Sequence, residues 1–527
     1  MFFRKSDFLK GMTQAPRAGN THLGYATFPG TVCFHEREVK HAPPRHFTNT
    51  STLELSAMKK FLGFALLVAL TAIGMGCGVS SSNNGGGGGG GNNQQSKIFV
   101  TGEDSPLSSV VGFNVTLNSV ALNGQDSSTA TVISTPTTVD FARLIGLRSP
   151  LAFNSVPPDT YVSATFVLAN PVIDYITLNP SPALNNMNGT FPNNANPYTL
   201  TVQFPTAMVV GANGLAGLRM DMDIRQSLAV DQNGNFTGAV NPVIYIKATH
   251  ASDPDGQVTD LTGGLVSVTA ASDYFVIQGP YGRQLTVYVN NSTVFNSGFN
   301  INNLTPPAII GVQGMFQADG SLLADHVEVI AVSHSFVSGR ILAIGTNGSG
   351  DTTVTMWVAE TGADMVSDVD TIQTIDIQNV STYEVCFFDN ALTQFVFSSP
   401  SDLLVGQRIF IGGDYTNSTF TPTMISLRRQ GASGLLDTGT VTISSGNKGS
   451  FDLLNNGLLG YAAGGPVPVD TFNGTLFVNL SGLSQLQSEQ TQIPLVVRGL
   501  FLKDPLNNNN PTFFAGLVAT PPTSTDK

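Results

Sequence analysis

The alternation of apolar and polar residues along most of the chain is the feature that most restricts its fold. From Lys97 onward this alternation has a period of two, as at 113–117, where Phe113, Val115 and Leu117 are separated by Asn and Thr. A period of two is typical of strands that bury one face. Asn-Gly pairs, such as those at 123–124 and 347–348, favour hairpin turns. Because only two short stretches, 141–146 and 481–489, favour a helix, the sequence predicts an all-β protein.

Three segments near the start of this region carry a more specific signal. They are FNVTLNSVAL at 113–122, TVDFARLI at 138–145 and VPPDTYVSATFVL at 156–168. This order of a strand pair, a V-D-L-x-x-L element and a P-x-G-T-Y turn resembles the bacterial domain-of-unknown-function family 4382. The resemblance continues through 218–223 and 238–246, although Asp159 stands where the turn usually has glycine. It implies an exported, β-sandwich-like domain and assigns no activity to it.

After a polar link at 252–256, the chain repeats one pattern of strands three times. Each repeat has an opening strand after glycine, an apolar closing strand and a last strand. The opening strands are expected at 264–268, 339–344 and 439–443, the closing strands at 309–316, 405–413 and 494–501, and the last strands at 324–330, 423–427 and 513–519. The segments 309–329 and 404–412 resemble domain-of-unknown-function family 5666. We expect closed or half-closed barrels of OB-like size, with the third repeat the most degenerate.

The fold class predicted from these patterns is an N-terminal β-sandwich-like domain followed by two or three small OB-like β-barrel modules. The predicted segments are an upstream piece at 1–57, a signal peptide at 58–76, a flexible tether at 77–96, the sandwich-like domain at 97–250, module 1 at 251–333, module 2 at 334–430 and module 3 at 431–527.

Residues 58–95 predict where the protein is located. Met58, Lys59 and Lys60 precede an uncharged run at 61–76 and then Cys77, which is the pattern of a secretory signal. The pattern resembles a bacterial lipoprotein signal, which implies acylation of Cys77, although Gly74 stands where that family usually has Leu, Val or Ile. A freely secreted protein and an uncleaved anchor are the alternatives. The glycines at 85–91 predict a flexible tether after the cysteine.

The upstream segment 1–57 does not fit an export signal. A misassigned start codon, with translation beginning at Met58, accounts for it. The alternative is a metal site at Cys33 and His35, whose spacing fits no standard metal pattern.

Charge and cysteine content exclude some classes of partner. The chain has a net charge of −12, and the part that follows residue 76 has 15 basic and 32 acidic residues, a net charge of −17. Such a chain repels nucleic acid and anionic lipid, so neither is an expected partner. Only Cys77 and Cys386 remain after cleavage, so a lipidated Cys77 leaves no intramolecular disulfide.

No constellation of residues in the sequence predicts catalysis, a metal or a cofactor. Asp221 and Asp223 alternate with methionines, and we interpret their shared face as solvated or as decorated by calcium. The histidines after residue 76, His250, His326 and His334, occur in no metal-binding or triad pattern.

Two single residues have alternative interpretations. Cys386 is expected to be a buried strand residue rather than a nucleophile. Trp357, the one tryptophan of the chain, is expected in a core, with an exposed sugar platform as the alternative.

The predicted function is a non-enzymatic binding or structural role in the bacterial cell envelope. The expected partners are the membrane, through the lipid on Cys77, and a polysaccharide or an envelope protein. A polysaccharide-binding or adhesive protein that uses Trp357 or Tyr281 is the first alternative. An enzyme with a site between modules, lined by Asp221, Asp223 or His326, is the second.

Overall fold

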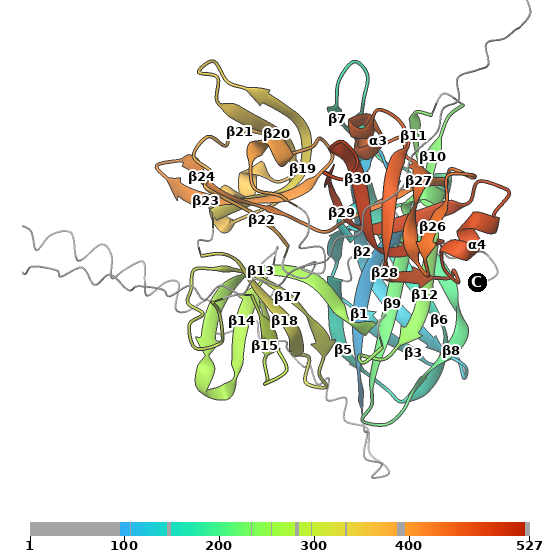
Figure 1. The fold of residues 1–527 in the computed structure, drawn as a ribbon. Helices are drawn as coiled ribbons and strands as arrows, with labels where there is room; N and C mark the ends of the chain where they lie inside the picture. The colour runs from blue at the N-terminus through green and yellow to red at the C-terminus, as the bar shows by residue number, and fades with distance from the viewer. Residues whose placement is uncertain are drawn as a thin grey trace, which may run out of the picture. The chain divides into compact units, whose positions relative to one another are not determined.

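The computed structural model describes residues 95–521, except 106, 145–148, 233, 254–255, 280–283, 297, 333–334 and 387–395. The signal at 58–76, Cys77, the tether up to residue 94 and the Cys33–His35 pair therefore lie outside the described residues, as do His334 and Tyr281. Strands dominate the described part, and its longest helices have six residues. The prediction of an all-β fold is confirmed (Figure 1).

The first unit is a β-sandwich that ends at residue 249. Its strands are β1 (Ser96–Ser105), β2 (Val110–Gly124), β3 (Thr129–Ile133), β4 (Thr137–Asp140), β5 (Ser149–Val156), β6 (Asp159–Thr177), β7 (Ala183–Asn188), β8 (Tyr198–Val210), β9 (Leu215–Asp223), β10 (Leu228–Val230), β11 (Phe236–Val240) and β12 (Ile244–Thr249). Its helical turns are η1 (Phe141–Leu144), η2 (Pro192–Asn194) and α2 (Ile224–Ser227).

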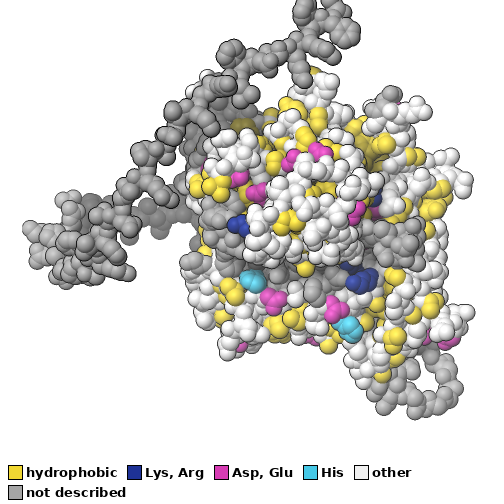
Figure 2. All heavy atoms as spheres, turned by 45° about the vertical axis from the view of Figure 1, so that its right-hand side comes forward, with side chains coloured by type: hydrophobic (Ala, Val, Ile, Leu, Met, Phe, Trp, Pro, Cys, Tyr) yellow, Lys and Arg dark blue, Asp and Glu magenta, His cyan; other side chains and the backbone are white. Residues whose placement is uncertain are grey.

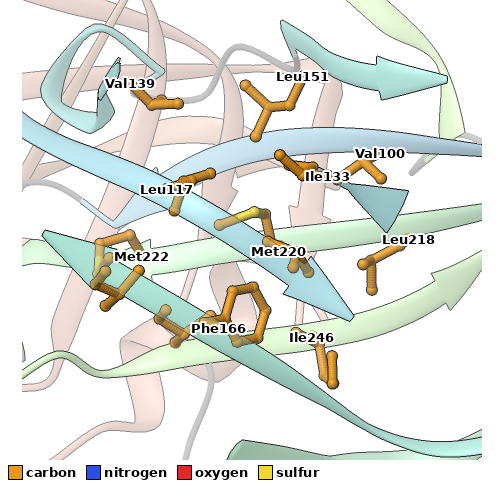
Figure 3. Packing of buried hydrophobic residues seen from close by; sticks show 14 of the residues in the cluster. Val100, Leu117, Ile133, Val139, Leu151, Phe166, Leu218, Met220, Met222 and Ile246 are labelled. Carbon is orange, nitrogen blue, oxygen red and sulfur yellow. The ribbon is translucent and has the colours of Figure 1, made fainter. Parts of the chain in front are cut away.

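Two main sheets form this sandwich. One has the order β12-β9-β1-β5, and the other has the order β3-β2-β6-β7, with β4 paired to β2 and β8 paired to β6. Apolar side chains of both sheets meet in one core, as Figure 3 shows for Val100 and Met220 of the first sheet and Leu117 and Phe166 of the second. Alternation along β2 and β9 thus places their apolar residues between the sheets, as the period of two predicts.

The turn at 157–161 explains one of the sequence motifs. The hydroxyl of Tyr161 donates a hydrogen bond to the carbonyl oxygen of Pro157 at 2.8 Å. The carboxylate of Asp159 accepts hydrogen bonds from its neighbour Thr160 N at 2.6 Å and from the Ser128 hydroxyl. Because Asp159 has no left-handed backbone conformation, this turn does not require the glycine that the motif usually has.

Three further units follow the sandwich, and we call them modules 1, 2 and 3. Module 1 has β13 (Val258–Thr269), η4 (Ala270–Ser272), β14 (Tyr274–Gln278), β15 (Gln284–Tyr288), β16 (Val294–Phe295), β17 (Ile309–Phe316) and β18 (Leu322–Ala331). Module 2 has β19 (Ser335–Thr346), β20 (Thr352–Thr361), η6 (Ala363–Asp368), β21 (Ile372–Asp376), β22 (Thr382–Val385), η8 (Pro400–Asp402), β23 (Arg408–Thr416) and β24 (Thr419–Leu427). Module 3 has β25 (Gln430–Leu436), β26 (Thr442–Ser445), β27 (Lys448–Leu454), α3 (Leu458–Ala463), β28 (Val467–Val478), α4 (Leu483–Ser488), β29 (Pro494–Asp504) and β30 (Asn510–Ala519).

The three modules share one pairing scheme. The opening strand pairs with the closing strand, which pairs with the last strand, in the orders β13-β17-β18, β19-β23-β24 and β25-β29-β30. A parallel pair, β15–β18, closes the barrel of module 1, and the antiparallel pair β25–β27 closes that of module 3. The predicted closing and last strands therefore lie where the sequence pattern indicated.

The predicted opening strand of module 3, at 439–443, was wrong. The opening strand is β25, and Gly439 lies in the turn after it with a left-handed φ of +94°. Sequence alternation missed β25 because it is rich in glycine and small residues. Those residues are required there, since a Cβ on Gly434 would lie 2.3 Å from the carbonyl oxygen of Leu454 on the neighbouring strand.

Side chains from different units pack together within the described part. Phe99 of β1 stacks on Phe316 of module 1, with ring centroids 5.0 Å apart. The side-chain amide of Asn455 in module 3 donates to the Ser108 hydroxyl of the sandwich at 2.9 Å. Leu500 of β29 is buried in the core of module 2. Neighbouring units therefore contribute side chains to each other's hydrophobic cores.

Candidate functional site

A small cavity lies where the sandwich, module 2 and the start of module 3 meet. It has a volume of about 40 Å³, and four arginines contribute to its walls. These arginines are Arg143, Arg340, Arg408 and Arg429. Charged side chains are sparse and scattered on the face drawn in Figure 2. Because only 11% of the residues in the chain are charged, four arginines around one small cavity are a notable concentration.

Arg143 is positioned by the V-D-L-x-x-L motif. Asp140, at the end of β4, accepts hydrogen bonds from Phe113 N at 2.7 Å and Ala142 N at 3.1 Å, which fixes the start of η1. Arg143 Nε then lies 2.8 Å from Asp140 Oδ2, and its Nη2 lies 2.7 Å from Oδ1 of Asp370 in module 2. Burial raises the pKa of Asp140, and the charge of Arg143 opposes that rise.

Trp357 forms part of the same wall. Its side chain is 2% exposed, and the guanidinium of Arg143 lies 5.7 Å from the centre of its ring. Its indole N–H is buried and has no acceptor among the described residues. The prediction that Trp357 belongs to a core is confirmed, and the sugar platform proposed as its alternative is excluded by this burial.

Arg340 and Arg408 face each other across neighbouring strands. They are directly paired in the register of β19 and β23, where like charges are unfavourable. Arg340 donates to the carbonyl oxygens of Gly406 at 3.3 Å and Gly431 at 3.5 Å, both long for such bonds. Burial, and after it the charge of Arg408, lowers the pKa of Arg340 to about 10.

A second charged cluster lies between modules 1 and 2. Arg428 Nη1 contacts Glu328 Oε2 of β18 at 2.9 Å, and these side chains are 2% and 3% exposed. The thiol of Cys386 lies 3.9 Å from the same oxygen. Burial, followed by the charge of Glu328, raises the pKa of the nearby Glu384 to about 7, and Arg428 opposes the rise. A buried ion pair therefore joins two modules and has a second carboxyl beside it.

The solvated face predicted for Asp221 and Asp223 was wrong. Their exposed fractions are 6% and 0%, because the sheet is covered on this side as well. Asp223 caps α2 by accepting from Gln226 N at 2.8 Å. Asp221 lies 3.9 Å from the guanidinium of Arg219. Both aspartates have structural contacts, and neither lines the arginine cavity.

The remaining predicted residues lie apart from each other. Cys386 is fully buried, as predicted, and directly follows β22. His326 lies in the middle of β18, and His250 is exposed in the turn after β12. Among the described residues, no group of three or more His, Cys, Asp or Glu side chains is arranged to hold a metal ion.

The chain was compared with known protein families. Residues 96–237 match a domain of unknown function, DUF4382, and residues 255–328 match a second one, DUF5666. The chain carries these two domains in this order. The resemblances at 113–237 and 309–328 are confirmed. The first match covers most of the sandwich and the second covers most of module 1, whereas the resemblance of 404–412 in module 2 stays a prediction. A search of curated proteins found no match.

The sequence did contain a signal for the arginine cavity. Arg340 and Arg408 occupy the opening and closing strands of the same repeat, in Gly339-Arg340-Ile341 and Gln407-Arg408-Ile409. Pairing those strands side by side would have brought the two arginines together. Nothing in the sequence indicated that Arg143 of the DUF4382 domain would join them.

Proposed function

We propose that this protein is a lipid-anchored, non-enzymatic binding or structural protein of the bacterial cell envelope. The observation that carries the proposal is the order of Lys59 and Lys60, an uncharged run, Cys77 and a glycine-rich spacer. An acyl chain contributes about 0.8 kcal/mol per buried CH₂, and two chains anchor a protein stably. Within the described residues, none of the helices has both the length and the apolarity that crossing a membrane requires.

The shared packing of the described units supports a structural or scaffold-like role. Contacts such as Phe99 with Phe316, and Arg428 with Glu328, join units that are separate along the chain. We infer that a body of this kind presents a fixed surface, joined to the anchor by the tether that the sequence predicts at 77–96.

The intact mass of protein extracted from membranes tests the anchor. We expect a chain that begins at Cys77 and carries acyl groups. The variant Cys77→Ser should leave the membrane fraction, whereas the matched control Cys386→Ser should stay there, because Cys386 is buried in the fold. A chain that begins elsewhere, or a Cys77→Ser variant that stays bound, would contradict the proposal.

A polysaccharide-binding role is a second candidate, favoured by a hollow in the DUF4382 domain. This hollow has a volume of about 260 Å³, and Asn170, Asn188, Asn194 and Asn196 contribute to it. Asparagine amides both donate and accept hydrogen bonds, which matches the hydroxyl groups of sugars.

A glycan array tests this second candidate. The candidate is supported if the wild type binds a glycan on the array and the double variant Asn188→Ala/Asn194→Ala does not. An array without signal for the wild type would count against it.

A further inference from the structure

The arginine cavity concentrates positive charge in an acidic chain. Four of the ten arginines that follow Cys77 contribute to its walls. One carboxylate, Glu360, also lines it. Two further carboxylates, those of Asp140 and Asp370, already form ion pairs with Arg143.

The strongest evidence for a bound anion concerns Arg340. Among the described residues, no carboxylate lies within ion-pair distance of its guanidinium, which contacts two carbonyl oxygens at long distances. Its direct neighbour across the sheet is the like-charged Arg408. Arg408 itself donates a hydrogen bond to the carbonyl oxygen of Arg429 at 3.0 Å. A buried guanidinium such as that of Arg340, whose neighbour across the sheet is also positively charged, is unfavourable unless an anion lies beside it.

A second, independent observation concerns Trp357. Its indole N–H is a donor that is buried without an acceptor in the described part of the chain. Buried donors without partners are rare in folded proteins and call for an explanation. An oxygen of a bound group in the cavity that Trp357 lines would supply the missing acceptor.

The size of the cavity limits what can bind. One water needs roughly 10–15 Å³ measured in this way, so about 40 Å³ accommodates a group of a few heavy atoms. Arginine forks match the spacing of oxygens in carboxylate and phosphate groups.

We propose that this cavity binds a small oxyanion, held by Arg340 and Arg408 with Trp357 as a further donor. The shared chemistry includes inorganic phosphate or sulfate and the carboxylate of an acidic sugar. The inference deepens the proposed binding role by naming a ligand class. It does not depend on the lipid anchor, because the residues that carry it all lie in the described body.

The single tryptophan makes the site directly measurable. Because Trp357 is the only tryptophan, its fluorescence in the purified full-length chain reports on this cavity alone. We expect a saturable change on titration with sodium phosphate, sodium sulfate or sodium glucuronate, and none with sodium chloride at equal ionic strength. Saturation by phosphate or sulfate would indicate an inorganic ligand, and saturation by glucuronate alone would indicate a sugar carboxylate.

Two variants and a control complete the test. Arg340→Gln should raise the Kd about tenfold or more, since one hydrogen bond to a charged group contributes about that much. Arg408→Gln should act in the same direction and provides a second measurement if the first variant folds poorly. Arg225→Gln removes the same charge from α2, outside the cavity, and should leave the Kd unchanged.

At one ligand concentration, the thermal unfolding temperature should also rise by the same amount in the wild type and Arg225→Gln, and by clearly less in Arg340→Gln. Equal responses to chloride and to every oxyanion, or an unchanged Kd in both cavity variants, would overturn the inference. Membrane release of Cys77→Ser would be unaffected by that result, so the anchor and the oxyanion site can fail separately.

Discussion

At the scale of single residues, burial determines the pKa and the contacts of the charged side chains. The apolar surroundings of Cys386, and the occurrence of most aromatic residues in apolar strands, correctly predicted that Cys386 and Trp357 are buried. The prediction for Asp221 and Asp223 failed, because a period of two identifies a second face without revealing whether another part of the chain covers it. To predict the arginine cavity, one must know which two strands pair, and single residues do not show this.

Glu384 gives a prediction at this scale. Its pKa is raised from an ordinary 4.5 to about 7, mainly by burial. Below pH 4.5 the carboxyl is neutral in both the folded and the unfolded chain. Between 4.5 and about 7 the unfolded chain loses the proton first, so the stability of the fold should fall as pH rises through this window.

The variant Glu384→Gln should flatten this part of the stability curve and be more stable than the wild type above pH 7. Thermal unfolding across this range of pH measures both effects. Burial, followed by the charge of Asp504, raises the pKa of Asp470 to about 6. Asp470 therefore also makes stability fall with rising pH, and it does so equally in the wild type and in Glu384→Gln. Glu489→Gln serves as a control at a carboxylate in another module, and parallel curves for wild type and Glu384→Gln would contradict the assignment.

At the scale of elements, the repeated strand order was largely predictable. Closing strands such as β17 and β29 are rich in apolar residues, which the sequence shows directly. The short helices η1 and α4 lie within the stretches predicted for them. β25 was missed because close backbone approach selects glycine, and glycine has no hydrophobic pattern to detect.

Gly434 gives the prediction for β25. Gly434→Ala should lower the free energy of unfolding by about 1–3 kcal/mol, because its Cβ would press against the backbone of β27. Gly474→Ala is the matched control, since a Cβ there meets no atom within 4 Å. Chemical unfolding of both variants measures the difference, and equal stability would show that β25 and β27 are not held this closely.

At the scale of the whole molecule, contacts between units were beyond prediction from the sequence. Each is made by residues far apart in the chain, such as Glu328 and Arg428, and no local pattern links them. The domain order itself was predictable, because each family has motifs within a short span of sequence.

The Glu328–Arg428 pair gives the prediction at this scale. Glu328→Gln should destabilise the protein by up to about 3–5 kcal/mol, because a buried guanidinium loses the charge beside it. The double variant Glu328→Leu/Arg428→Met should recover most of that loss. A double-mutant cycle in chemical unfolding measures the coupling, and additive losses would show that the pair does not join modules 1 and 2 energetically.

The parallel pairing of β1 with β9 has a consequence for the order in which the chain can fold. Lys97 is paired with Leu215, so β1, the first strand of the described part, waits for more than a hundred later residues before its sheet is complete. The modules repeat this delay on a smaller scale, since each opening strand pairs with a closing strand that is made near the end of its unit. High contact order of this kind slows folding and exposes unpaired edges. A chain that completes its sheets this late stays unfolded for longer, which is compatible with the export that we propose for it.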